Sequence, residues 1–254
     1  MRRPHIEALR LVNGRPVEGA APGAVAMEPP LRRARGRDEA MFLLLVDLGA
    51  DAPAQLYREL REVTARAFWT AEGSVTAALR RAVARATRFL FQFNVRRPPE
   101  ERRYGGLTCA AVQEEEVFLA QAGLSWAGAV SDGTLEVFYP GDLPRLGSAS
   151  YVDLRLTYFI PTPGDTLLIV PRRLREVSSP QVFERVLARP EIGGVLDGLE
   201  QISAGEDVTL LLVRWPTESA PQVTEPPRDR PRRRPAPRPQ PRPTPAPRPQ
   251  RAAR

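Results

Sequence analysis

Short apolar runs alternate with short polar segments over most of the first 216 residues. The clearest series lies at residues 105–139, where a Glu-Glu-Glu segment and a Ser-Asp-Gly segment separate three apolar runs: residues 107–112, 117–121 and 134–138. Breaks of this kind between β-prone runs are typical of antiparallel strands joined by tight turns. The sequence therefore predicts a β-meander, around which the rest of the chain packs.

The segment before the meander predicts one buried strand and two amphipathic helices. Residues 41–46 are continuously apolar, which indicates a strand buried on both faces. Apolar residues then recur at steps of three and four, as in helices with one buried face: Leu56, Leu60, Val63 and Ala67, then Val75, Leu79, Ala82, Val83, Ala86, Leu90 and Phe93. Four arginines lie off the apolar face of the second helix, and we interpret them as solvated, with phosphate binding as the alternative: Arg80, Arg81, Arg85 and Arg88.

Further strands and helices are predicted on both sides of these elements. An amphipathic edge strand at residues 6–12 precedes a loop at residues 19–36. Apolar runs after the meander predict three more strands: residues 154–159, 166–170 and 207–215. Between the last two, Pro180 begins one helix, and a stripe of apolar residues marks another: Leu196, Leu199 and Ile202. Helices grouped against sheets define an α+β fold.

The formal charge of +7 is concentrated at the C-terminal end of the chain. From Thr217 onward there are ten arginines and three acidic residues, so the preceding part is neutral, with 27 basic and 27 acidic residues. A partner attracted by charge is therefore expected only for the C-terminal segment. All 37 basic residues are arginine, which we interpret mainly as the coding bias of a GC-rich genome.

The composition itself changes at Thr217. Proline occupies every odd position from 235 to 249, and the segment has almost no residue that a core could bury. We expect residues 217–254 to form a disordered, extended, Pro/Arg-rich basic tail. The alternating run contains no P-x-x-P core, which weakens an SH3-ligand interpretation. Residues 1–40 are expected to belong to the folded domain at residues 41–216.

Cysteine and histidine are too few for several kinds of catalytic site. Cys109 and His5 are the only residues of their types, which excludes an internal disulfide and a His-based zinc site and disfavours Ser-His-Asp or Cys-His catalysis. Cys109 is expected to be a buried strand residue. No apolar run is long enough for a signal peptide or a membrane span, so we expect a cytoplasmic protein without a transmembrane segment.

Six segments, taken in order with the helix pair between the first two, resemble the motifs of a known family. They are Leu-Val-Asp at 45–47, Gly-Leu-Thr-Cys-Ala-Ala at 106–111, Phe-Leu-Ala-Gln-Ala-Gly at 118–123, Ser-Asp-Gly at 131–133, Pro-Gly-Asp-Thr-Leu-Leu-Ile at 163–169 and Glu-Asp-Val-Thr-Leu-Leu-Leu-Val at 206–213. Over about residues 40–215 the set is similar to the metal-dependent serine/threonine phosphatases of the protein phosphatase 2C (PPM) type. The resemblance implies two antiparallel β-sheets sandwiched between helix pairs, and two-metal hydrolysis of phosphate esters.

Several metal-ligating positions of that family are changed in this sequence. Asp47 matches a ligand of the first motif, but Leu48 replaces the glycine that should follow it. Leu124 stands where the second motif has an aspartate, and Arg172 stands where the third motif has one. The family pattern therefore implies a degenerate metal site.

The remaining motifs leave a reduced set of acidic residues. At the last motif, Glu206 and Asp207 are both acidic, but their arrangement differs from that of the family. Residues 37–39 resemble the N-terminal signature of the family only weakly. Because a cation repels a divalent ion, we predict that no binuclear centre forms. We hypothesise that Arg172 or Arg173 replaces the metals by pairing with one of the remaining carboxylates. The alternative places both arginines in solvent.

These observations favour a catalytically inactive pseudophosphatase without a cofactor, which binds a protein as a regulatory module in phospho-signalling. One alternative is a divergent active phosphatase with Mg²⁺ or Mn²⁺ held by three carboxylates: Asp47, Glu206 and Asp207. Another is weak binding of nucleic acid or an anionic surface by three arginines of the tail: Arg232, Arg233 and Arg234. Trp126 and Tyr139 are interpreted as core residues rather than as a ligand surface.

Overall fold

The structure is a computed structural model, and it describes residues 3–17, 19, 21–49, 51–138, 143–151, 153–203 and 205–217. Contacts within the chain group residues 1–218 into one compact unit. The predictions made for the Pro/Arg-rich segment, including Arg232, Arg233 and Arg234, and the prediction for Tyr139 lie outside the described residues.

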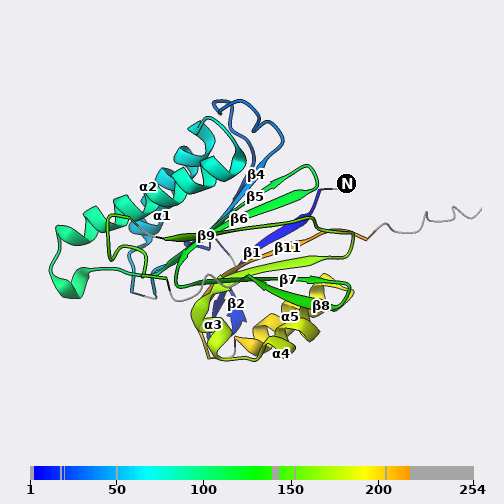
Figure 1. Ribbon diagram of the computed structural model, residues 1–254. Helices are drawn as coiled ribbons and strands as arrows, with labels where there is room; N and C mark the ends of the chain where they lie inside the picture. The colour runs from blue at the N-terminus through cyan, green and yellow to red at the C-terminus, as the bar shows by residue number, and fades with distance from the viewer. Residues whose placement is uncertain are drawn as a thin grey trace, which may run out of the picture. The chain divides into compact units, whose positions relative to one another are not determined.

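The compact unit is built on two antiparallel sheets that lie face to face (Figure 1). In spatial order, the six-stranded sheet contains β2 (Arg15–Pro16), β1 (His5–Val12), β11 (Val208–Arg214), β10 (Thr166–Pro171), β7 (Ser125–Ser131) and β8 (Thr134–Phe138). The five-stranded sheet contains β3 (Ala24–Met27), β4 (Met41–Asp47), β5 (Gly106–Gln113), β6 (Glu116–Gly123) and β9 (Leu154–Phe159).

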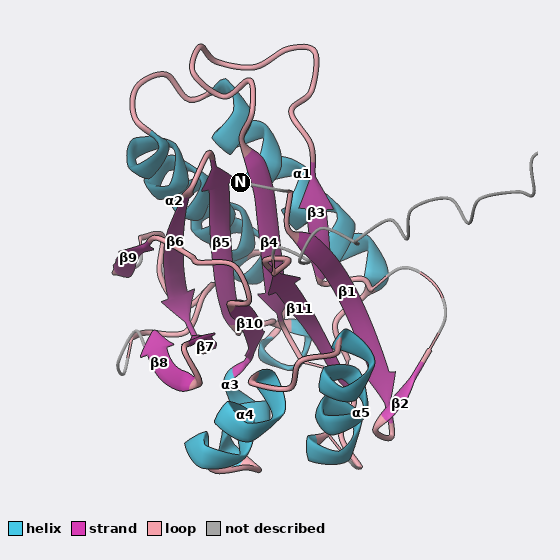
Figure 2. Ribbon diagram, turned by 90° about the vertical axis from the view of Figure 1, so that its right-hand side faces the viewer, coloured by secondary structure: helices cyan, strands magenta, loops and turns pink. Residues whose placement is uncertain are grey.

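Helices cover the outer face of each sheet (Figure 2). The five-stranded sheet carries α1 (Ala54–Thr70) and α2 (Val75–Val95), and a short 3₁₀ turn, η1 (Pro99–Glu101), follows α2. The six-stranded sheet carries α3 (Arg172–Glu176), α4 (Pro180–Leu187) and α5 (Ile192–Ile202). The predicted α+β class, with two antiparallel sheets between groups of helices, is confirmed. Among the described residues, no helix combines the length and the apolar character needed to cross a membrane.

Strand β4 shows how the sequence produces this layering. Phe42, Leu44 and Val46 pack toward α1 and α2, whereas the alternating Leu43 and Leu45 pack between the two sheets. Successive side chains of a strand point to opposite faces, so a continuously apolar run supplies both layers. The prediction of a strand buried on both faces is confirmed.

The predicted meander is divided between the two sheets. Strands β5 and β6 form a hairpin in the five-stranded sheet, whereas β7 and β8 form a hairpin in the six-stranded sheet. The chain changes sheets at Leu124, directly after Gly123, whose φ of +67° lies in the left-handed region that favours glycine. The expectation of one continuous meander was therefore wrong, because local turn signals do not say which sheet a hairpin joins.

The predictions missed β7, whose sequence Ser-Trp-Ala-Gly-Ala-Val-Ser has few β-prone residues, and several shorter elements. Both predicted helix pairs and the strands after the meander are present, and the predicted edge strand is β1, which pairs with β11 and, at its end, with β2. The segment predicted to be a loop contains β3, and the predictions did not include α3 or the two-residue β2. These short elements have too few residues for a periodic pattern to be recognised.

Cys109 is fully buried in β5, as predicted, and burial raises the pKa of its thiol. Because the thiolate is the reactive form, the folded protein is expected to react with a thiol reagent at neutral pH only as fast as it unfolds. The measurement is the rate of reaction with Ellman's reagent, with and without denaturant. Equal rates in the two conditions would show that the thiol is accessible in the native state.

Candidate functional site

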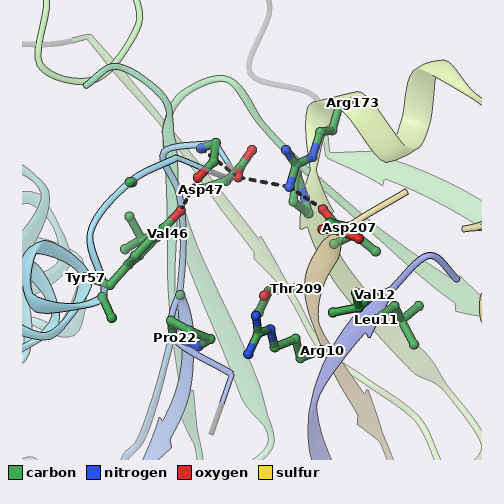
Figure 3. A pocket seen from close by; sticks show the side chains of 16 residues that line it. Arg10, Leu11, Val12, Pro22, Val46, Asp47, Tyr57, Arg173, Asp207 and Thr209 are labelled. Atoms are coloured by element: carbon green, nitrogen blue, oxygen red, sulfur yellow. Dashed lines mark hydrogen bonds and ion pairs between the residues drawn. The ribbon is translucent and has the colours of Figure 1, made fainter. Parts of the chain in front are cut away.

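A pocket of about 260 Å³ lies where ends of the two sheets meet (Figure 3). The five-stranded sheet contributes Asp47, the last residue of β4, and α1 contributes Tyr57. The other side is formed by Arg10 of β1, by Arg173 in the first turn of α3 and by Asp207, which precedes β11. Charged side chains from four separate parts of the chain thus surround one small hollow.

Arg173 occupies the side of the pocket that faces Asp47. Its Nη2 lies 3.4 Å from Oδ1 of Asp47 and donates a hydrogen bond of 2.7 Å to the backbone oxygen of Asp207. The side chains of Arg173 and Asp47 are 35% and 19% exposed, so water screens this ion pair only in part. One guanidinium therefore connects the ends of the two sheets across the pocket.

The carboxylate of Asp207 is held by the turn between β1 and β2. Its Oδ1 accepts a 2.9 Å hydrogen bond from the backbone N–H of Asn13, whose φ of 52° is left-handed. Asparagine tolerates this conformation better than most residues. The turn therefore positions Asp207 at the rim of the pocket, while its backbone oxygen accepts the hydrogen bond from Arg173.

Tyr57 fixes the backbone just after Asp47. Its hydroxyl donates to the oxygen of Gly49 at 3.0 Å and accepts from the N–H of Leu48 at 3.1 Å. Burial raises the pKa of Tyr57 above its ordinary value, and the nearby Asp47 carboxylate adds to the increase. The hydroxyl therefore stays protonated at neutral pH and remains a donor to Gly49.

Arg10 lies at the opposite side of the pocket, beside Thr209 in the neighbouring strand (Figure 3). Its side chain makes no hydrogen bond or ion pair with any other residue that the structure describes. Neither Arg10 nor Tyr57 was predicted from the sequence to be a site residue. The alternation of β1 indicates that Arg10 projects away from its buried neighbour Leu11, but only the pairing of β1 with β11 places it at this pocket.

The structure brings together some of the predicted site residues and separates others. Asp47 and Asp207 line the same pocket, whereas Glu206, Leu124 and Arg172 are not among its described lining residues. Arg172 instead pairs with Glu176 within α3, its Nε lying 3.2 Å from Oε1. Consecutive residues of a helix point about 100° apart, so Arg173 and Arg172 leave α3 in different directions.

Trp126 packs outside the pocket. It is buried between the six-stranded sheet and the helices α3–α5, with its ring centroid 5.3 Å from that of Phe183. Its interpretation as a core residue is confirmed. Strand β7 turns Trp126 toward the outer helices, so its side chain does not lie between the two sheets.

Residues 37–39 also lie away from the pocket. Arg37 is buried, its Nη2 donates to the backbone oxygens of Ala71, Gly73 and Ser74, and its guanidinium carbon lies 5.2 Å from the centroid of the Phe68 ring. These contacts hold the turn between α1 and α2. The role of Arg37 is therefore structural.

The residues at the pocket do not fit a binuclear metal centre. Among the described residues, no group of three or more His, Cys, Asp or Glu side chains is placed to hold a metal ion. Asp47, which could contribute, is paired with Arg173, and Asp207 accepts a backbone hydrogen bond. Divalent ions such as Mg²⁺ and Mn²⁺ prefer several oxygen ligands, and this pocket offers two carboxylates and two guanidinium groups.

The fold is that of the PPM-type serine/threonine phosphatases. Serine/threonine phosphatase Stp1 from Staphylococcus aureus superposes with a TM-score of 0.65 at 15% identity, covering 84% of this chain and 95% of that chain. The PPM Ser-Thr phosphatase MsPP from Mycobacterium smegmatis gives 0.59 at 14% identity, covering 84% and 98%. The catalytic domain of phosphatase PstP, solved with two manganese ions, gives 0.59 at 16% identity, covering 83% and 96%.

No protein-family profile matches the sequence, and no curated protein matches it significantly. At 14–16% identity the similarity to the solved structures establishes the shared fold. Any activity of this chain depends on the residues that line its own pocket.

Proposed function

We propose that this chain is a catalytically inactive PPM-type domain, a pseudophosphatase that acts as a binding or regulatory module in phospho-signalling. Its partner in this proposal is a protein, its location is the cytoplasm, and it needs no cofactor. The folded domain extends to residue 216 and carries the Pro/Arg-rich segment as a separate tail.

The observation that carries the proposal is the position of the Arg173 guanidinium between Asp47 and Asp207. In two-metal phosphoryl transfer, the ions bridge oxygens and offset the charge that develops on the transferred group. Here a fixed cation of the chain itself pairs with the carboxylate that matches the family's first motif. A guanidinium can bind an anion, but it does not polarise a water molecule as a divalent ion does.

Electrostatic repulsion supports the same conclusion. Two unit charges about 4 Å apart interact by about 4 kcal/mol near a protein surface, and a divalent ion doubles this. A metal ion at Asp47 would have to displace Arg173 and lose the attraction between the two side chains. Arg173 therefore disfavours a metal at this position, because the ion must either bind beside a cation or displace it.

An active, divergent phosphatase is the alternative that one observation favours. Asp47 and Asp207 line the same pocket and are both acidic, as a single-metal site would require. The third carboxylate of that hypothesis, Glu206, does not line the pocket. Nucleic-acid binding by the tail is a further alternative that depends on residues 217–254.

The proposal is tested by measuring hydrolysis of p-nitrophenyl phosphate and of a phosphothreonine peptide with added Mn²⁺. We expect the same background rate for the wild-type chain, for Asp47→Ala and for the matched control Glu62→Ala, an exposed acid on α1. The active alternative predicts Mn²⁺-dependent turnover in the wild type and in Glu62→Ala that is lost in Asp47→Ala. That result would overturn the proposal.

A further inference from the structure

A groove runs between α1 and α2 on the side of the molecule away from the sheets. It consists of two adjoining hollows of about 560 and 580 Å³, which share Phe89 and Gln92. We call the two together the α1/α2 groove. It is formed entirely by the helix pair and its flanking turns, so it is separate from the pocket at Asp47.

The first hollow is strongly basic. It is lined by Arg66 of α1 and by Arg81, Arg85 and Arg88 of α2, and none of its described lining residues is acidic. All four side chains are exposed, and none makes a hydrogen bond or ion pair with another residue that the structure describes. Because the part of the chain before Thr217 has no net charge, this local excess of positive charge is not a general property of the domain.

The arrangement of these arginines does not help α2 to fold. Arg81 and Arg85 are four residues apart and Arg85 and Arg88 three apart, so like charges are neighbours on the helix surface. Such pairs destabilise a helix by about 0.2–0.5 kcal/mol each. The 21 residues of α2 include no acidic residue that could offset this repulsion. A negatively charged partner would remove it.

The bottom of the α1/α2 groove is apolar. Val63 and Phe89 are half-buried in the basic hollow. Phe93 is half-buried in the second hollow, which Leu56 also lines, and the guanidinium carbon of Arg97 lies 3.5 Å from the centroid of the Phe93 ring. The groove follows α1 from Gln55 to Thr70, a length of about 22 Å at 1.5 Å per residue. A groove of this length between two helices, with apolar side chains along part of its floor, matches the face of an amphipathic helix of about four turns.

We propose that the α1/α2 groove binds an amphipathic helix of a partner protein. The apolar face of that helix lies on Val63, Phe89 and Phe93. Its acidic residues lie at the end that contacts the four arginines of the first hollow. This interaction does not depend on whether the pocket at Asp47 hydrolyses phosphate esters. If the domain has the regulatory function proposed above, the α1/α2 groove is the surface through which it binds its protein partner.

The second hollow favours a protein helix over a nucleic acid. It is less basic than the first hollow, because Glu59 and Glu101 line it beside Arg96, Arg97 and Arg103, and Arg97 is already paired with Glu101, its Nε lying 3.8 Å from Oε2. A phosphate backbone carries negative charge along its whole length and would place some of it against these two carboxylates, whereas a helix can carry its acidic residues at one end only. The C-terminal segment of this chain is excluded by its charge, because it carries ten arginines from Thr217 onward.

The test uses the full chain and a fluorescein-labelled synthetic helix of about 15 residues. Its leucines repeat at steps of three and four, and its glutamates are concentrated in one half. Anisotropy titrations compare the wild type with Arg81→Glu/Arg85→Glu and with the matched control Arg58→Glu/Arg80→Glu. The control changes the same charge at exposed positions that do not line the groove, and circular dichroism verifies the fold of both variants.

We expect the Arg81→Glu/Arg85→Glu variant to bind the peptide roughly tenfold more weakly than the wild type, and the control to bind it within a factor of about two. Replacing the leucines of the peptide by serine should abolish binding. Equal losses in both variants, binding that survives the loss of the leucines, or no binding to the wild type would overturn the proposal. It would also be overturned if a single-stranded oligonucleotide bound more tightly than the peptide and lost more affinity in Arg81→Glu/Arg85→Glu.

Discussion

Trp126→Ala is expected to lower the free energy of unfolding by about 3–5 kcal/mol, the range for removal of a large buried aromatic side chain. Trp126 is 1% exposed and packs against Phe183 and the buried face of α3 and α4. Gly128, two residues along β7, shows how closely the ring is enclosed: a Cβ there would lie 2.7 Å from the ring atom Cη2. Removal of the ring therefore leaves a cavity among closely packed neighbours.

Urea unfolding followed by circular dichroism measures this loss. Tyr151→Ala is the control, because the Tyr151 side chain is 76% exposed and its removal should change stability by less than about 0.5 kcal/mol. If Trp126→Ala cost no more than the control, Trp126 would not be a core residue, and its position between the sheet and the helices would be wrong.

Gly106→Ala is expected to cost about 3 kcal/mol, at the upper end for overpacking, because the new methyl group meets backbone rather than a flexible side chain. A Cβ at Gly106 would lie 2.1 Å from the backbone oxygen of Leu124. This is the point at which the chain passes from the five-stranded to the six-stranded sheet. Gly106 also pairs with Asp47, so the strain would reach the pocket.

Gly193→Ala in α5 is the matched control for this substitution. Among the described residues, and apart from its chain neighbours and the nearby backbone of α5, no heavy atom lies within 4 Å of the Cβ position at Gly193, and alanine favours a helix over glycine by about 0.5–1 kcal/mol. The control should therefore be slightly more stable than the wild type in the same urea titration. A Gly106→Ala variant as stable as the wild type would show that the two backbones do not approach each other at Leu124.

Elements with a strong local pattern could be predicted from the sequence. The apolar run that forms β4 and the apolar stripes of α1 and α2 are long enough to indicate both the element and its buried faces. The change of sheets at Leu124 could not be predicted, because strand pairing depends on residues far apart in the chain. Gly123, just before the change of sheets, has a left-handed φ, but many turn glycines have one too, so this feature does not identify the change of sheets.

The candidate site could be predicted only in part, because it too is formed by residues far apart in the chain. Asp47 stands at the end of an obvious strand, and the family pattern directs attention to it. Whether Arg172 or Arg173 faces it depends on where α3 begins, which five residues without a clear pattern do not reveal. Tyr57 was not predicted to be a site residue, because it belongs neither to the apolar stripe of α1 nor to the charged residues. Its hydroxyl nevertheless forms hydrogen bonds with the backbone beside Asp47.

The ion pair between Arg173 and Asp47 is the centre of this account of the pocket. The most direct measurement is a calorimetric titration of the purified chain with Mn²⁺, with the catalytic domain of PstP, which was solved with two manganese ions, measured alongside and Asp47→Ala as the pocket variant. We expect no saturable binding up to millimolar Mn²⁺ in the wild type and the same trace for Asp47→Ala. Saturable binding by the wild type that is lost in Asp47→Ala would contradict it.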